Sequence, residues 1–215
     1  MINIFRITFL LSLIFTLDEG LLYDLNFRGY NAGESMLSIK KDSIDIESNY
    51  YLTSIIKTNK FLDRFYKIRD RVDVILNDED FSIIKVEKKL NQGGKKTNFT
   101  SIIDQENLTA SSNNKTISIP GRVFDPLGAI YYLRNQNIAV GDTFELTTYD
   151  NDKLKNLFIV AKDIETVSTS IGNFECIVLT PQSKDGKLLK NKGSMTIWLS
   201  NDEKKIPIKI ENRTN

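Results

Sequence analysis

The chain has 215 residues, 40% of them hydrophobic and 27% charged, with 29 basic residues against 28 acidic ones. That length can bury one sizeable core without disulfide or metal staples. A formal net charge of +1 predicts no nucleic-acid partner, because nucleic-acid binding domains usually carry a clear basic excess. The sequence has no histidine and a single cysteine, Cys176. This composition excludes Ser-His-Asp and Cys-His catalysis and a thiolate zinc cluster, so no cofactor and no metal site are expected.

The first residues have the pattern of an export signal. Arg6 precedes an apolar run from Ile7 to Leu17, which fits the hydrophobic region of a signal peptide and is too short to span a bilayer. No cysteine follows that could take a lipid. We therefore expect residues 1–18 to be signal-peptide-like and residues 19–215 to form a single β-rich domain, soluble or peripherally associated in the periplasm. A buried N-terminal strand or helix of a cytoplasmic protein is the alternative.

Alternating apolar and polar residues, the pattern of half-buried strands, dominate the rest of the chain. Strands are expected to begin near Leu21, Ser35, Tyr50, Tyr66, Phe81, Thr97, Leu108, Thr116, Thr143, Leu154, Phe174, Gly193 and Ile206. Turn sequences join several of these strands: Asn91-Gln92-Gly93-Gly94, Ile171-Gly172-Asn173 and Lys184-Asp185-Gly186-Lys187. Connections this short indicate antiparallel hairpins rather than parallel units.

One segment has helical periodicity instead. Asp125 followed by Pro126 is typical of a helix start, with an acceptor at the N-cap and proline in the first turn. Leu127, Ile130 and Tyr131 then share one face, and Arg134 ends the segment. A shorter second helix is expected around Asn59 to Phe65. The predicted fold is mainly β, a single antiparallel, strongly curved sheet forming a partial barrel or sandwich, with one short amphipathic helix packed on it.

Two residues of the C-terminal strands stand out. Cys176 alternates with Phe174 and Val178 in an apolar strand, a pattern that favours a buried thiol over a reactive one. Trp198 points away from Met195, Ile197 and Leu199, which occupy the other face of the same strand. Its indole is expected either to line a concave ligand site or to pack beneath the helix.

Several segments together resemble the bacterial domain-of-unknown-function family numbered 3108. They are Leu22-Tyr23-Asp24-Leu25 with Gly29 and Ala32-Gly33-Glu34, the run Phe124 to Arg134, Gly172 to Cys176, and Met195 to Asp202 followed by Ile206-Pro207-Ile208. The resemblance implies an exported Gram-negative protein with an open, curved β sheet, and it implies no established activity. Family members run on into another strand after Ile208, whereas this chain stops at Asn215.

Two hypotheses for function come from different classes. The first is a non-catalytic binding or scaffolding module of the cell envelope, whose partner is a lipid or other amphipathic small molecule, or an envelope protein. Its expected ligand-binding residues are Tyr131, Tyr132, Arg134 and Trp198, with Asp125 as a structural cap. The alternative is an envelope hydrolase or lyase that uses carboxylates such as Asp70 or Asp125 with Arg71 or Arg134.

Overall fold

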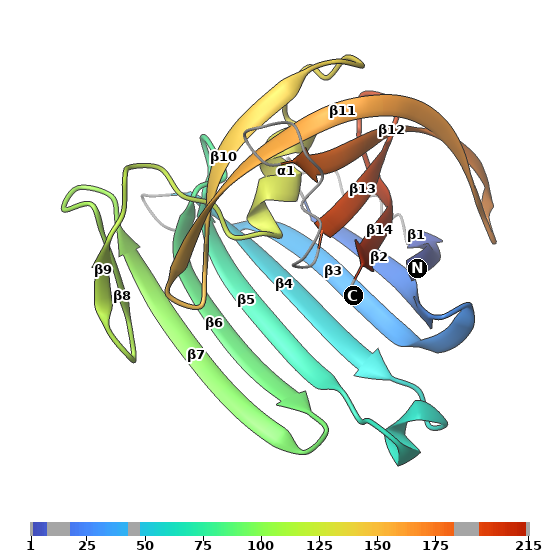
Figure 1. The fold of residues 1–215 in the computed structure, drawn as a ribbon, viewed down its shortest axis with the longest axis horizontal. Helices are drawn as coiled ribbons and strands as arrows, with labels where there is room; N and C mark the ends of the chain where they lie inside the picture. Colours follow the sequence, from blue (N-terminus) through green and yellow to red (C-terminus); the bar gives the residue numbers. More distant parts are fainter. Residues whose placement is uncertain (1, 8–17, 43–47, 183–193, 214–215) are drawn as a thin grey trace.

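The structure is a computed structural model that describes residues 2–7, 18–42, 48–182 and 194–213. Within these residues the strands form two antiparallel sheets, of eight and five strands, and neither is closed or strongly curled. One short helix, α1 (Gly128–Arg134), lies between the two sheets (Figure 1).

The larger sheet is a meander in which each strand pairs with the next along the chain. Its strands are β2 (Glu19–Phe27), β3 (Tyr30–Asp42), β4 (Asn49–Thr58), β5 (Arg69–Asn77), β6 (Ile83–Gln92), β7 (Lys95–Asp104), β8 (Thr109–Ser112) and β9 (Thr116–Ser118). The connection from β4 to β5 contains a short 3₁₀ turn, η1 (Leu62–Arg64). The helix expected around Asn59 to Phe65 is therefore reduced to a single turn.

The smaller sheet is a second antiparallel meander. Its strands are β10 (Thr143–Asp150), β11 (Lys153–Thr169), β12 (Gly172–Gln182), β13 (Ser194–Ser200) and β14 (Pro207–Arg213). The first strand, β1 (Ile2–Ile7), pairs with β2 and meets β14 at Ile210, so backbone pairing continues from one sheet into the other.

The N-terminal segment is described only in part. β1 falls within residues 1–18, and residues 8–17, which hold most of the expected signal sequence, lie outside the described residues. The signal peptide therefore stays a prediction. In the described part of the chain, no helix is both long enough and apolar enough to cross a bilayer.

The prediction of a single, strongly curved sheet is wrong, although the mainly β class with one short helix is confirmed. Strands β2 to β14 begin within three residues of the expected positions, except β3, which begins five residues before Ser35, and α1 ends at Arg134 as expected. β1 was not among the expected strands. The hairpin turns at Gly93-Gly94 and Gly172 are present, whereas the one at Lys184–Lys187 lies outside the described residues. Residues 119–142, which contain α1, separate β9 from β10, so the first meander ends there and β10 starts a second sheet.

The apolar core has two parts. The larger cluster joins the inner face of the eight-stranded sheet to Tyr131 of α1 and to side chains of the smaller sheet, among them Val178, Trp198 and Ile208. In the second cluster, Ile130 and Leu133 of α1 pack against the other face of the smaller sheet. That face presents the alternate residues of the same strands, such as Ile177, Leu179, Ile197 and Leu199. α1 therefore buries side chains toward both sheets. Three of the four expected ligand-binding residues, Tyr131, Tyr132 and Arg134, belong to this helix.

Candidate functional site

Asp125 binds the backbone at the start of α1. Its Oδ1 accepts a hydrogen bond from the amide of Leu127 at 2.8 Å, and its carbonyl oxygen accepts one from the amide of Ala129 at 2.9 Å. These bonds cap the turn that leads into α1, whose regular helix begins at Gly128 with Leu127 at the N-cap position. The side chain is buried, and this burial raises the pKa of the Asp125 carboxyl above its ordinary value.

Arg134, at the other end of α1, ties the helix to β2. Its guanidinium donates two hydrogen bonds to the carboxylate of Glu19, at 2.6 and 2.8 Å, and two longer ones to the carbonyl oxygen of Lys204. The side chain is 10% exposed. Burial acts to lower the pKa of Arg134, but the hydrogen bonds and charge of Glu19 outweigh it and raise the pKa. This bidentate contact is a strong form of ion pair.

Tyr131 belongs to the same contact. Its ring lies 4.9 Å from the Arg134 guanidinium carbon, and its hydroxyl donates a long hydrogen bond of 3.4 Å to Glu19. Burial, followed by the negative charge of Glu19, raises the pKa of Tyr131. Nearby, the Tyr23 hydroxyl donates to the carbonyl oxygen of Pro207 at 2.9 Å. Two of the expected ligand-binding residues therefore lie together, and both make contacts within the fold.

Tyr132 points to different neighbours. Its ring packs against Phe124 with centroids 4.8 Å apart, and the Arg122 guanidinium lies 5.4 Å from both ring centroids. The aromatic pair and its cation brace the segment that leads into α1. Tyr131 and Tyr132 are therefore adjacent in sequence but lie in separate contacts.

Trp198 lies on the strand face that alternation predicts, opposite Ile197 and Leu199. Its Nε1 donates to Glu165 Oε2 at 2.8 Å, and Lys209 Nζ lies 3.9 Å from the ring centroid. These partners come from β11 and β14, whereas the partners of Arg134 come from β2 and the β13–β14 loop. The structure therefore does not gather the four expected residues into one site.

A buried charged contact that sequence reasoning missed lies between the sheets. Lys88 of β6 pairs with Asp150 of β10, and the charge of Lys88 also acts on Asp125. The Lys88 side chain is 10% exposed. Strand alternation could have revealed this contact, because Lys88 lies on the same inward-facing side of β6 as Val86. A lysine at an inward position predicts a buried carboxylate partner.

Tyr149, the neighbour of Asp150, forms a second buried polar contact. Its hydroxyl lies 2.8 Å from Ser101 Oγ and donates to Asp152 Oδ1 at 2.9 Å. Burial raises the pKa of Tyr149 to about 12, so the phenol stays protonated at neutral pH. These polar groups satisfy one another and connect β7 to the β10–β11 turn.

The carboxylates and arginines of the alternative hydrolase hypothesis do not meet. Asp70 accepts a hydrogen bond from the Asn91 amide at 2.9 Å and lies near the β6–β7 turn. Asp125 lies near the opposite end of the sheet, since the helix it caps approaches Leu76 of β5. Arg71 pairs with Asp73 on its own strand. No two of these candidates form the paired geometry that acid–base hydrolysis requires.

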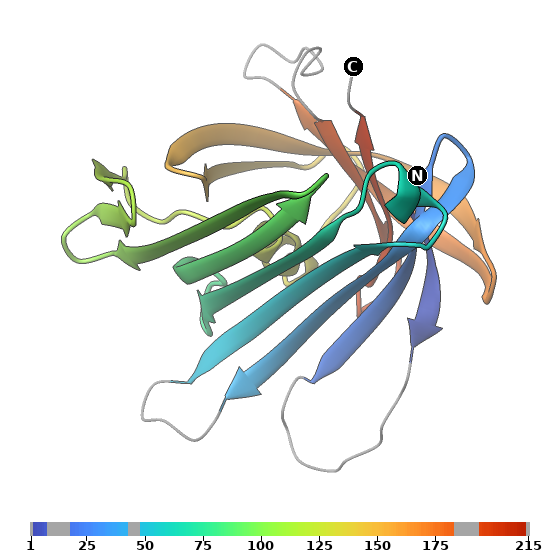
Figure 2. The ribbon, with the colours of Figure 1, turned by 90° about the horizontal axis from the view of Figure 1, so that it is seen from below.

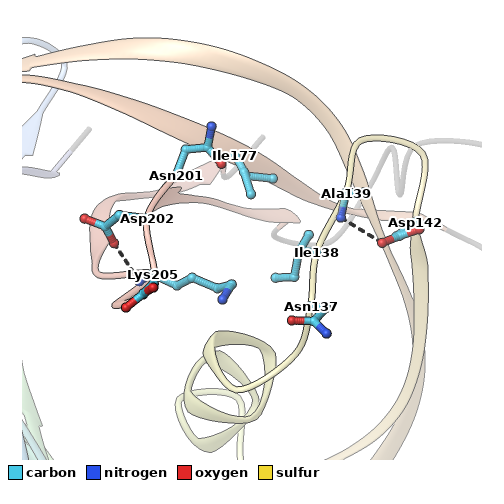
Figure 3. A pocket seen from close by; sticks show the side chains of 9 residues that line it. Asn137, Ile138, Ala139, Asp142, Ile177, Asn201, Asp202 and Lys205 are labelled. Atoms are coloured by element: carbon cyan, nitrogen blue, oxygen red, sulfur yellow. Dashed lines mark hydrogen bonds between the residues drawn. The ribbon is translucent and has the colours of Figure 1, made fainter.

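A shallow, open pocket of about 380 Å³ lies beside α1, between residues 137–142, β12 and residues 201–205 (Figure 3). Two of its three acidic residues, Asp142 and Asp202, bind the backbone of their own turns, and the third is Glu203. Asp142 accepts a hydrogen bond from the Ala139 amide, and Asp202 accepts bonds from the backbone amides of Lys204 and Lys205. The pocket therefore has the chemistry of a pair of capped turns rather than of a preformed binding site.

Cys176 is buried, as the sequence predicts, and burial raises the pKa of its thiol to about 11. A thiol with that pKa is a poor nucleophile at neutral pH. Among the described residues, no group of three or more acidic or cysteine side chains is placed to hold a metal ion.

Comparison with known proteins gives one finding. A family model described as a protein of unknown function, DUF3108, matches residues 22–215, which confirms the resemblance drawn from the sequence motifs. Comparison with curated proteins and with solved structures gives no match.

Proposed function

This chain belongs to the DUF3108 family of proteins of unknown function, and we propose that it is a non-catalytic binding or scaffolding module of the bacterial cell envelope. Export to the periplasm is part of the proposal, and the apolar run from Ile7 to Leu17 behind Arg6 supports it. The partner is an amphipathic molecule or surface, and the module meets it on the outside of the fold.

The proposal rests on one observation: the expected site residues make their contacts with other groups of the same fold. Arg134 is held by Glu19, Tyr132 by Phe124, and Trp198 by Glu165 and Lys209. A carrier that held its ligand between sheet and helix would need some of these groups directed at the ligand. Here Arg134 joins α1 to β2, Tyr132 packs on the segment that leads into α1, and Trp198 contacts its neighbours within the smaller sheet. The groups are therefore used by the fold itself, which supports a role as a rigid scaffold.

Trp198 offers a test because it is the single tryptophan of the chain. It is 6% exposed and packs within the larger core cluster. Trp198→Ala is expected to lower the free energy of unfolding by roughly 3–5 kcal/mol, as truncation of a large core residue does. Addition of a fatty acid or phospholipid monomer should leave Trp198 emission unchanged.

Native mass spectrometry of protein purified from its own envelope completes the test. The proposal expects no stoichiometric lipid inside the fold. A retained lipid together with a shift of Trp198 emission would replace the scaffold with an interior carrier. A small stability loss for Trp198→Ala would count against its role in the core.

A further inference from the structure

Three loops gather at one end of the eight-stranded sheet. They are the β2–β3 turn with one flanking residue on each side (27–30), the β4–β5 connection with the first residue of β5 (59–69), and the β6–β7 turn with the first two residues of β7 (93–96). They follow one another along that end (Figures 1 and 2). We call this surface the basic aromatic end. Backbone contacts hold the loops together, because the Asn59 amide donates to the carbonyl oxygen of Ala32 at 2.9 Å and the Gly93 amide to that of Lys67 at 2.9 Å.

Five large aromatic side chains at this end face solvent. The exposed fractions are 58% for Phe27, 80% for Tyr30, 66% for Phe61, 74% for Phe65 and 52% for Tyr66. Isolated exposed apolar residues are ordinary, but a group on adjoining loops marks an interaction surface. These rings lie outside the core clusters formed by the buried residues, so packing within the domain does not explain them.

Three of the five rings, those of Phe61, Phe65 and Tyr66, have defined contacts. Phe61 and Phe65 meet edge to face with centroids 5.6 Å apart. The ring of Tyr66 lies against Gly93, where an added Cβ would come within 2.5 Å of the ring and where φ is +59°. Glycine is needed at that turn on both counts. A preorganised aromatic surface loses little conformational entropy on binding.

The same loops are strongly basic. They contain seven basic residues, Arg28, Lys60, Arg64, Lys67, Arg69, Lys95 and Lys96, and one acidic residue, Asp63. Asp63 is already bound to Arg69 through two contacts of 2.5 and 3.0 Å. In the described part of the chain no other ion pair involves these seven residues. The chain as a whole has a net charge of +1, so the positive charge of this end is a local feature.

We propose that the basic aromatic end docks on the surface of an anionic lipid bilayer. Lysine and arginine attract acidic phospholipid headgroups, and phenylalanine and tyrosine rings are favoured at the depth where headgroups meet acyl chains. The rings belong to three neighbouring connections at one end of the domain (Figures 1 and 2), so a single surface can meet them. The inference deepens the proposed function and rests on it in one respect, that the partner binds outside the fold.

Vesicle co-sedimentation tests the proposal with the full chain. The matched pair of variants is Lys60→Gln/Arg64→Gln/Lys67→Gln at the basic aromatic end and Lys153→Gln/Lys155→Gln/Lys162→Gln on β11, where all three lysines are exposed. Both variants remove three positive charges and leave residues 1–17 unaltered. Wild type should bind vesicles of phosphatidylglycerol and phosphatidylethanolamine and release them at high salt, and it should bind phosphatidylcholine vesicles far less.

The first triple variant should bind anionic vesicles about 100-fold more weakly, since each basic residue near such a surface contributes about 1 kcal/mol, or roughly fivefold in affinity. The β11 variant should bind as wild type does. Equal losses in the two variants would overturn the proposal, and so would equal wild-type binding to neutral vesicles. Loss of binding to duplex DNA or an acidic protein with vesicle binding unchanged would assign the surface to another polyanion.

A second measurement reports ring insertion directly. Phe65→Trp places an indole at the tip of the β4–β5 loop, and its emission should shift to the blue when anionic vesicles are added. Brominated lipid should quench it, while buried Trp198 contributes a constant background. An unshifted emission at saturating lipid would overturn insertion. Failure here with no lipid retained in native mass spectrometry would leave the proposed scaffold standing, so the two failures are distinguishable.

Discussion

The interior of this protein and its basic aromatic end use charge in opposite ways. Between the sheets each buried cation lies against a carboxylate, Arg134 with Glu19 and Lys88 with Asp150. The three loops of the basic aromatic end contain seven basic residues and a single acid, Asp63, and the neighbouring Asp70 is buried against Asn91 and Gln92. Both regions belong to one domain with a net charge of +1, so the sum of charges conceals the contrast.

The difference indicates which charges serve folding. A buried cation without a counterion is costly, so pairing in the interior is a requirement of stability. Like charges gathered on a surface repel one another and add nothing to folding, so their presence indicates an external partner. The opposite end of the sheet, residues 78–82 and 104–108, has five acidic residues and no basic one. There Asp78 pairs with Lys41 and Asp80 with Arg122, which partly neutralises that end.

Breaking the interior pair should give the largest effect on stability. Glu19→Ala leaves the Arg134 guanidinium buried without its carboxylate, and we expect the free energy of unfolding to fall by about 3–5 kcal/mol. Glu19→Gln keeps an oxygen acceptor and should lose less. Urea unfolding measures both. Glu106→Ala, in the acidic loop after β7, is the matched control and should change stability by less than about 0.5 kcal/mol. If both substitutions lowered the free energy of unfolding equally, buried paired charges would matter no more for stability than exposed ones, and the comparison would be wrong.

Asp125 should give an intermediate effect that depends on pH. Asp125→Ala removes the oxygen that accepts from Leu127 and should cost about 0.5–2 kcal/mol, whereas Asp125→Asn keeps an acceptor and should cost much less. Burial raises the pKa of Asp125 above its ordinary value near 3.8. The stability linked to its protonation is thus fully present below pH 3.8 and is lost as pH rises through the raised pKa.

Unfolding curves of wild type and Asp125→Asn at successive pH values from 3 to 7 measure this dependence. Asparagine has no charge to desolvate, so the stability of the variant relative to wild type should rise through the titration and then level off. A relative stability that instead falls as pH rises would mean that attraction between Asp125 and Lys88 outweighs the cost of burial.

Local sequence signals predicted the strands and the helix well, because alternation and capping depend on neighbouring residues. Asp125 followed by Pro126 located the turn that leads into α1, two residues before the regular helix, and alternation placed Trp198 on the face opposite Ile197. The family also followed from short motifs read in order. These features need no knowledge of which strands face each other.

What the sequence did not reveal depends on contacts between distant residues. Alternation within a hairpin is the same whether the hairpin extends one sheet or begins a second one, so the division at residues 119–142 was missed. Arg134 was expected to face a ligand because its partner, Glu19, lies far away in the chain. The basic aromatic end was missed for the same reason, since its three loops are separated by the strands that bring them together.

Neutralising the basic aromatic end should have the smallest effect on stability. Lys60→Gln/Arg64→Gln removes two exposed charges that have no carboxylate partner among the described residues. The free energy of unfolding should change by less than about 0.5 kcal/mol, and its sign should be stabilising at low ionic strength because repulsion among the remaining cations is reduced. At about 0.1 M salt, the interaction between exposed charges more than about 10 Å apart is largely screened. Raising the salt concentration should therefore stabilise wild type more than the variant, until the two unfolding curves coincide.

Urea unfolding at 10 mM and 300 mM sodium chloride measures the difference, with Lys153→Gln/Lys155→Gln as the control for two charges on β11. A fall of several kcal/mol in the free energy of unfolding would show that these cations support the fold. The distinction between interior charges that stabilise the fold and surface charges that do not would then be wrong.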